Sequence, residues 1–264
     1  MTRKRPSSNR PFILVSNDDG IDSPGILALA RSLARIGEVV VVAPSTQQSA
    51  VGHAITVQVP LRTHRFYRNG KMFGWAVDGT PADCVKLAVL SLLDRKPDLV
   101  VSGINHGMNT AINIIYSGTV SAATEGSILG IPSIAVSLAT HDTTADLGTA
   151  ALFARKLARE VLRRGLPPGT LLNVNIPNVP RGEIAGVKVT EQGRSWWDDG
   201  FERRIDPQGR EYYWLVGTYK RDQNRNCDDY ALRKNFISIT PLHYRLTDSG
   251  LLREMNDWNV ERLW

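Results

Sequence analysis

The chain runs FILVSNDDG from residue 12 to residue 20, four apolar residues followed by a polar turn with two adjacent carboxylates. The apolar run is typical of a buried strand, and the polar residues come where that strand ends. Successive side chains of a strand point to opposite faces, but once the chain turns at Gly20 the carboxylates of Asp18 and Asp19 can converge on one hard cation. The alternative is a polar turn whose aspartate caps the following helix.

The rest of the chain alternates short apolar runs with helical patterns, which is typical of a mostly parallel sheet flanked by helices. The predicted strands cover residues 12–16, 38–43, 98–102, 133–137 and 171–175. Apolar residues recur at helical spacing after Pro24, and a second helix is predicted to begin beside the cap residue Thr80. Residues 56–77 are interpreted as a β excursion, so the predicted fold class is α/β.

The composition changes after about residue 180, where aromatic residues are set among charged ones. This change indicates a second, smaller, strand-rich region. We therefore expect a flexible basic tail at 1–10, a metal- and phosphate-binding core at 11–180 and a smaller region at 181–264. One hypothesis for the aromatic residues is that they stack on a nucleobase, and a local apolar core is the alternative; the tryptophans concerned are Trp196, Trp197 and Trp214.

Composition narrows the functional classes. The chain has 264 residues, 42% of them hydrophobic, and a formal net charge of +6. Its basic residues are dispersed among acids, so no nucleic acid polymer is expected as a partner. No run approaches the roughly 20 apolar residues that cross a bilayer, so no membrane association is expected. Cys84 and Cys227 have no paired spacing, which favours a cytoplasmic location.

Two further loops lie at the carboxyl ends of predicted strands, where ligands bind in open parallel sheets. Residues 45–49 offer hydroxyls and side-chain amides, and residues 103–109 include Asn105, whose carbonyl oxygen suits a hard cation. His53 and His106 are candidates for steering or protonation; the alternative is that they are structural loop histidines.

A phosphate-binding segment is predicted at Ser117-Gly118-Thr119, which precedes a helical stretch of small residues at 120–126. Free backbone N–H groups and the helix dipole at such a start favour a phosphate, although simple helix capping is the alternative. Two carboxylates with neutral oxygens are typical of Mg²⁺ or Mn²⁺, whereas zinc would need a His or Cys cluster. Such a cation polarises a phosphoryl oxygen and activates water, so the pattern predicts hydrolysis of a phosphomonoester.

These residues resemble the motifs of the SurE family, the stationary-phase survival proteins that act as metal-dependent nucleotidases. The resemblance follows the chain in order, through residues 14–21 (LVSNDDGI), 24–26 (PGI), 42–44 (VAP), 52–56 (GHAIT), 79–85 (GTPADCV), 101–107 (VSGINHG), 116–120 (YSGTV), 130–135 (GIPSIA) and 237–242 (ISITPL).

The resemblance implies a Rossmann-like α/β domain followed by a smaller region whose extended hairpin exchanges between subunits. A homodimer or homotetramer is therefore expected. One divalent metal ion, Mg²⁺ or Mn²⁺, is implied, and its ligands would be Asp18, Asp19, Ser49 and Asn105.

The resemblance also implies the reaction. Asp18, Asp19 and Asn105 would act in catalysis, and a metal-activated water would attack a nucleoside monophosphate to give a nucleoside and phosphate. The 5′ ester is the implied substrate, with the 3′ ester and polyphosphate as further ones. The residues near the substrate phosphate would be Ser117, Gly118 and Thr119.

Two positions depart from the family pattern. Many relatives have Ser-Gly where this chain has Ser49-Ala50, and an acidic pair where it has Ile112-Asn113. The second change would alter the substrate range if that pair contacts substrate. Two other functions stay open, namely a phosphatase acting on a sugar phosphate or polyphosphate, and a catalytically poor nucleotide-binding sensor.

Overall fold

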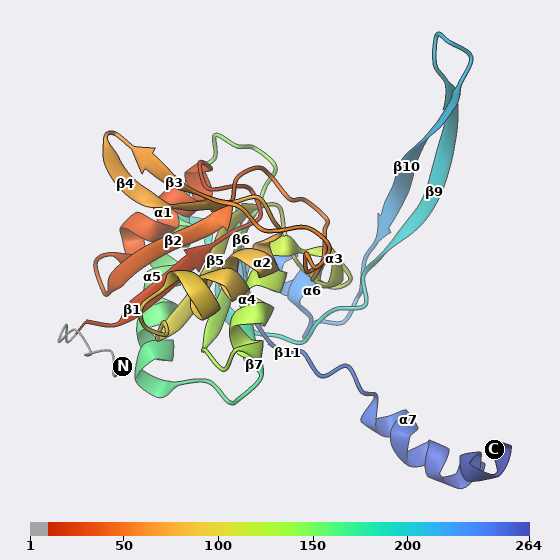
Figure 1. Cartoon of the computed structure of the whole chain (residues 1–264). Helices are drawn as coiled ribbons and strands as arrows, with labels where there is room; N and C mark the ends of the chain where they lie inside the picture. The colour runs from red at the N-terminus through yellow and green to blue at the C-terminus, as the bar shows by residue number, and fades with distance from the viewer. Residues whose placement is uncertain (1–9) are drawn as a thin grey trace.

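Nine strands form one mixed sheet in the computed structural model, which describes residues 10–264 (Figure 1). Their order across the sheet is β3-β4-β2-β1-β5-β6-β7-β11-β8. Strands β4, β2, β1, β5, β6 and β7 are parallel, whereas β3 and β11 run antiparallel to their neighbours β4 and β7. The bounds are β1 Phe12–Ser16, β2 Glu38–Pro44, β3 Thr63–Arg68, β4 Lys71–Val77, β5 Leu99–His106, β6 Ser133–Ala139, β7 Thr170–Pro177, β8 Gly186–Val189 and β11 Phe236–His243.

Helices cover both faces of this sheet (Figure 1). One face carries α1 (Pro24–Leu33) and α5 (Gly148–Arg164), and the other carries α2 (Pro81–Leu87), the π-helical turn η1 (Ala88–Leu92) and α4 (Gly118–Ile128). The central strands bury their apolar side chains on both sides, as a parallel sheet between two helical layers requires. The predicted α/β class with a mostly parallel, Rossmann-like sheet is confirmed.

Local signals decide where the first two helices begin. Ser23 caps α1, and Pro24 occupies its first turn, where a missing N–H costs nothing. Thr80 and Asp83 form a reciprocal capping box at the start of α2, with the Thr80 hydroxyl accepting from the Asp83 amide and the Asp83 carboxylate accepting from the Thr80 amide. Both predicted helix starts are therefore confirmed.

Strand β5 differs from its prediction. We expected it to end at Ser102, with Asn105 in the following loop, but the strand continues to His106. The pairing with β6 shifts register between Ser102 and Asn105, and this irregularity lets the ladder resume beyond Gly103. Asn105 is consequently held within the sheet. The predicted β excursion contains the β3–β4 hairpin, whereas its first residues, 56–62, form no strand.

The chain beyond residue 180 divides between the main sheet and two projecting segments. Strands β8 and β11 join the main sheet, and α6 (Asp228–Arg233) lies against it. Strands β9 (Trp196–Ile205) and β10 (Glu211–Lys220) form a separate two-stranded ribbon that extends away from the sheet, as expected for an extended hairpin (Figure 1). A C-terminal segment also projects, comprising α7 (Ser249–Glu254), η3 (Met255–Trp258) and η4 (Val260–Leu263).

Two short helical elements complete the fold, namely α3 (Asn113–Tyr116) and η2 (Arg181–Glu183). The predicted basic tail, residues 1–10, lies outside the described residues except for Arg10. Within residues 10–264, no helix combines the length and apolar character needed to cross a membrane.

Candidate metal and phosphate site

The two adjacent carboxylates lie at the topological switch point of the sheet. Strand β1 has β2 on one side and β5 on the other, and ligands of open parallel sheets bind at the carboxyl ends of strands at such a point. The turn after β1 is held by Asn17, whose Nδ2 donates to the Gly20 carbonyl and to Ser23 Oγ, at 2.9 Å each. Gly20 has a φ of 95°, which an L side chain rarely adopts. Sequence reasoning missed this clamp, although an asparagine before Asp-Asp-Gly is a known turn signal.

Asp18 is buried and held from two sides. Its Oδ1 accepts a short hydrogen bond from the Thr119 hydroxyl of α4, and its backbone carbonyl accepts from the Gln48 amide at 2.7 Å. Burial, with the neighbouring charge of Asp19, raises the pKa of Asp18 to about 6 against the opposing hydrogen bond from Thr119. A bound cation would offset the cost of this buried negative charge.

Asp19 offers the clearest free ligand atom. Its Oδ2 is buried and accepts no hydrogen bond within the described part of the chain, and the nearest cationic candidate, His106 Nδ1, is 3.9 Å away. Burial raises the pKa of Asp19, partly opposed by the His106 backbone amide. Burial also lowers the pKa of His106, which favours its neutral ring. A buried carboxylate oxygen without a donor is costly unless a cation compensates it.

Asn105 and Ser49 are brought to the same edge of the sheet. The Asn105 amide is oriented by a 2.8 Å hydrogen bond from its Nδ2 to the Gly107 carbonyl, so its oxygen is left as the available ligand atom. Ser49 is exposed, and its hydroxyl accepts a 2.8 Å hydrogen bond from Gln47 Nε2. Ser49 directly follows Gln48, whose backbone amide donates to the Asp18 carbonyl. The neighbouring Ala50 has a φ of 56°, a conformation that favours the glycine of the family pattern.

These donors fit a hard divalent cation. They are two carboxylates, a carboxamide oxygen and a hydroxyl, which suit Mg²⁺ or Mn²⁺ together with several waters. Within residues 10–264 no group of three or more His, Cys, Asp or Glu side chains is arranged to hold a metal, so a zinc-type cluster is absent from that range. The four ligand assignments stay a prediction.

The start of α4 lies directly against the carboxylates. Ser117 caps this helix by accepting from the Val120 amide at 3.0 Å. A Cβ placed on Gly118 would lie 2.7 Å from Asp18 Cβ and 3.0 Å from Asp18 Oδ2, so only glycine permits this approach. Because the Thr119 hydroxyl is engaged with Asp18, any phosphate contact from this segment falls to backbone N–H groups and Ser117.

The two candidate histidines have different surroundings. His106 lies beside Asp19, as described above. His53 Nε2 instead lies 2.9 Å from Glu125 Oε2, and Lys86 Nζ lies 2.6 Å from Glu125 Oε1. Glu125 itself is buried in α4. This arrangement ties His53 to the helix layer, in keeping with the structural alternative.

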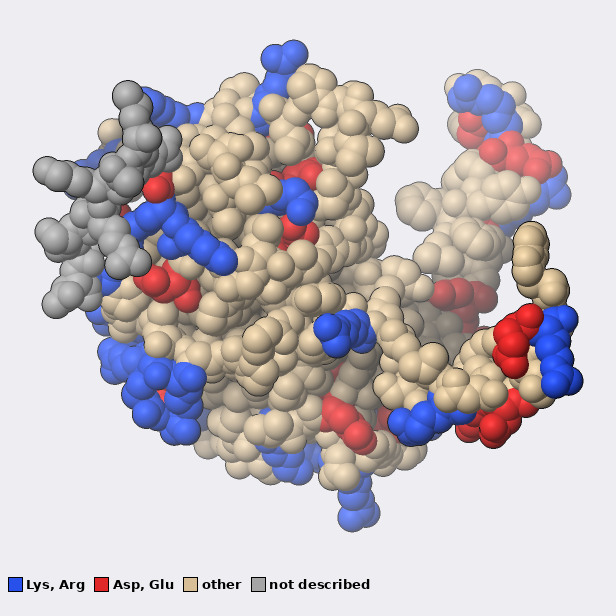
Figure 2. All heavy atoms as spheres, turned by 60° about the horizontal axis from the view of Figure 1, so that its bottom comes forward, with Lys and Arg blue, Asp and Glu red and all other residues tan. Residues whose placement is uncertain are grey.

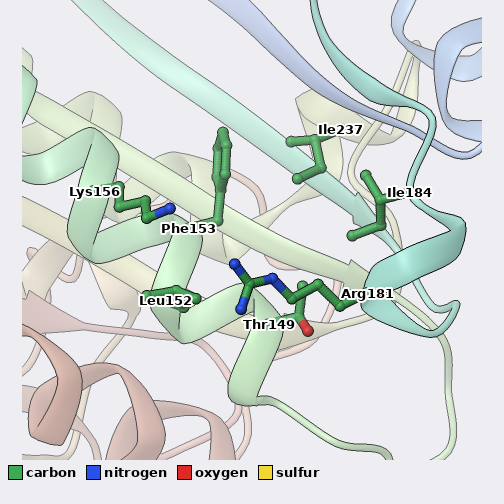
Figure 3. Close-up of a pocket in the computed structure, with 7 residues that line it drawn as sticks. All are labelled: Thr149, Leu152, Phe153, Lys156, Arg181, Ile184 and Ile237. Atoms are coloured by element: carbon green, nitrogen blue, oxygen red, sulfur yellow. The ribbon is translucent and has the colours of Figure 1, made fainter.

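Two hollows on the helical face formed by α1 and α5 are lined without carboxylates. A 180 Å³ pocket between α5 and η2 has an apolar floor that includes Phe153 and Ile184, with Lys156 and Arg181 beside it (Figure 3). A 330 Å³ groove between α1 and α5 is lined by three arginines, Arg31, Arg35 and Arg155. Figure 2 shows basic side chains spread over several separate areas, with acidic ones among them.

Comparisons with known proteins agree with this geometry. The family model described as "Survival protein SurE" matches residues 13–199. A relative from Chlorobium limicola named 5'-nucleotidase SurE is 52% identical over 254 residues, covering 96% of this chain and 98% of its own. A relative of the same name from Syntrophobacter fumaroxidans is 49% identical over 249 residues, covering 94% and 99%. The crystal structure of a SurE protein from Aquifex aeolicus superposes with a TM-score of 0.82 at 42% identity, covering 94% of this chain and 99% of that one.

Proposed function

This chain belongs to the SurE family, and we propose that it is a 5′-nucleotidase that hydrolyses nucleoside monophosphates to a nucleoside and inorganic phosphate. The observation that carries the proposal is the identity of about half over nearly the full length with relatives named 5'-nucleotidase SurE. The geometry at the switch point of the sheet supports it, because carboxylates and a helix start meet there.

We propose one Mg²⁺ or Mn²⁺ ion, held by Asp18, Asp19, Asn105 and Ser49. When bound, such an ion supplies positive charge that polarises a phosphoryl oxygen and lowers the pKa of a water. The chain's own part is to hold the ligands in place. The Thr119 hydroxyl fixes the orientation of Asp18, and the Gly107 carbonyl fixes the amide of Asn105.

The start of α4 is the proposed binding site for the substrate phosphate. Its N-terminal N–H groups carry the positive end of the helix dipole, which favours an anion. Ser117 caps this 11-residue helix and Gly118 begins it, and the absence of a Gly118 side chain lets backbone and phosphate approach the carboxylates closely. Thr119 contributes by positioning Asp18.

The proposal extends to further substrates, to assembly and to cellular location. Cleavage of 3′ esters and of polyphosphate would use the same site, because neither requires a different phosphate position. Assembly into a homodimer or homotetramer is supported by the exposed apolar side chains of the hairpin. A cytoplasmic location is supported by Cys84 and Cys227, which are buried and form no disulfide.

A phosphate-release assay tests the proposal. The chelator-treated protein is offered 5′- and 3′-nucleoside monophosphates, a sugar phosphate and polyphosphate, with and without added Mg²⁺ or Mn²⁺. We expect metal-restored release that favours 5′-nucleotides. Release that favours the sugar phosphate would replace the nucleotidase by a general phosphatase. Folded protein that binds nucleotides but releases no phosphate with either metal would be the nucleotide-binding sensor.

A further inference from the structure

A cavity of 490 Å³ adjoins the phosphate site and lies between the base of the hairpin and α3. One wall comes from Asn113 and Tyr116 of α3 together with Ala50, and the other comes from the ribbon. The ribbon contributes Trp197, Asp199, Leu215, Val216 and Gly217. This volume lies within the range of about 300–1,000 Å³ that is usual for small-molecule sites.

The ribbon directs one face at this cavity. Trp197 pairs with Tyr219 across the ladder, and Asp199 pairs with Gly217, so these side chains share a face under the alternation of a strand. A Cβ on Gly217 would lie 2.6 Å from Asp199 Oδ1. Glycine at this position therefore keeps the wall open.

Trp197 is held in a fixed orientation. Its Nε1 donates to Asn113 Oδ1 at 2.9 Å, and its ring lies 5.0 Å from the Tyr219 ring, centroid to centroid. The side chain is 41% exposed, so it keeps a surface available for contact. An aromatic side chain immobilised before binding offers a stacking surface at little cost in conformational entropy.

The cavity wall is joined through the chain to the phosphate site. Tyr116 immediately precedes Ser117, and its backbone carbonyl accepts from the Gly52 amide at 3.0 Å, which ties the loop after β2 to α3. Ala50, on the cavity wall, follows the proposed ligand Ser49. A molecule whose phosphate lies at the start of α4 therefore has this cavity directly beside it.

The polar groups of the cavity suit the neutral part of such a molecule. The Asp199 carboxylate repels a phosphate and accepts hydrogen bonds, and the Asn113 amide nitrogen is left to donate because its oxygen already accepts from Trp197. An aromatic surface with one donor and one acceptor is the complement of a nucleobase.

We infer that this cavity binds the nucleoside moiety of the substrate, with Trp197 stacking on the base and Asn113 and Asp199 forming its polar contacts. The inference rests on the proposed nucleotidase function and names the part of the site that selects nucleotides from other phosphomonoesters. It also assigns a role to Asn113, one of the two positions that replace the acidic pair of the family pattern.

Kinetics with two substrates test this assignment. Phosphate release from a nucleoside 5′-monophosphate and from a small aryl phosphate is measured for the wild type, Trp197→Ala and Trp197→Phe. We expect Trp197→Ala to lower kcat/KM for the nucleotide about tenfold or more, mainly through KM, because loss of stacking weakens binding of the base. The value for the aryl phosphate is expected to stay within twofold. Trp197→Phe keeps an aromatic surface and is expected to recover most of the nucleotide value.

Trp196→Ala is the matched control, because Trp196 is the neighbouring residue of β9, is 52% exposed and does not line the cavity. It is expected to leave both substrates unchanged. An equal loss for both substrates in Trp197→Ala overturns the inference, and so does an equal loss in both tryptophan variants. A change in oligomeric mass together with such an equal loss would identify the cavity as a contact with a second copy of the chain.

Nucleoside binding separates failure of this inference from failure of the proposed function. Binding of an unphosphorylated nucleoside to the intact protein is followed by ligand-observed NMR, with no need for turnover. Binding that Trp197→Ala abolishes supports the cavity even if the wild type releases no phosphate. The opposite result is efficient nucleotide hydrolysis with no nucleoside binding and no kinetic effect of the Trp197 variants. It would support the nucleotidase function and overturn the assignment of this cavity.

Discussion

Asp19 has a carboxylate oxygen, Oδ2, that is buried and meets no hydrogen-bond donor among the described residues. We predict that Asp19→Asn weakens Mn²⁺ binding and lowers kcat/KM about 100-fold or more, since a metal contributes several kcal/mol to charge stabilisation. Calorimetric titration with Mn²⁺ and phosphate release measure the two effects. The control is Asp22→Asn, an exposed acid three residues further along. Unchanged metal affinity in Asp19→Asn would contradict the ligand assignment.

Gly118 tests the contact between α4 and the carboxylates. Because a Cβ there would lie 2.7 Å from Asp18 Cβ, Gly118→Ala must displace Asp18 or the start of the helix. We predict a loss of about 1–3 kcal/mol in the free energy of unfolding, typical of overpacking, with a larger proportional loss of phosphate release. Chemical denaturation and kinetics measure these quantities. Gly182→Ala is the control. Its new Cβ meets nothing within 4 Å, so the free energy of unfolding and phosphate release are both expected to be unchanged. A fully active Gly118→Ala protein would show that this approach is unimportant.

Single residues were predictable where their role is local. Asp18 and Asp19 follow β1 by two and three positions, and their neighbourhood at the sheet edge follows from the parallel topology. The contact between Trp197 and Asn113 joins residues 84 positions apart, and no local pattern encodes it. The bond from Thr119 to Asp18 was likewise not foreseen, because it joins residues 101 positions apart and the sequence placed Thr119 only near the phosphate.

At the scale of elements, α2 and α4 are joined by an ion-pair cluster around Glu125. Burial raises the pKa of Glu125, but contacts from His53 and Lys86 outweigh it and hold the pKa below its ordinary value of 4.5. The unfolded chain therefore binds a proton at Glu125 more readily than the folded one. The cluster stabilises the fold fully above about pH 4.5 and loses this effect as the pH falls through the lower folded value.

Glu125→Gln tests that linkage. We predict a loss of about 1 kcal/mol in the free energy of unfolding at pH 7, because Lys86 and His53 are partly exposed and screened. The difference from the wild type should shrink as the pH falls below 4.5. Urea denaturation at several pH values measures it, with Glu160→Gln on the exposed face of α5 as the control. A loss that does not change with pH would exclude the charge as its cause.

Elements with terminal signals were the most predictable. Pro24 marked the start of α1, because a proline there lacks an N–H that would go unpaired, and Thr80 marked the start of α2, because its side chain replaces a missing backbone partner. The extension of β5 to His106 was not predictable, since it depends on how β6 accommodates the irregularity after Ser102. The pairing of β11 with β7, which adds an antiparallel strand to a parallel sheet, is also decided by tertiary packing.

At the scale of the whole molecule, the hairpin presents apolar side chains that the described chain leaves uncovered. Phe201 is 71% exposed and Trp214 is 57% exposed. Exposed apolar surface of this kind marks an interface in a soluble protein. We predict that the wild type is a dimer or larger in solution and that Phe201→Glu shifts its mass toward the monomer, as measured by light scattering. Arg210→Glu at the end of the ribbon is the control, and an unchanged mass in Phe201→Glu would contradict the interface.

The edges of the two sheets have a further consequence. One edge strand of the nine-stranded sheet is β8, which has only four residues. The other is β3, which carries Arg65 and Arg68 and whose pairing is irregular between Phe66 and Tyr67. Short, bulged and charged edges resist the addition of foreign strands. Strands β9 and β10 have ten residues each, and each has one free edge. If this protein forms fibres under stress, we expect the hairpin to be the template on which they grow.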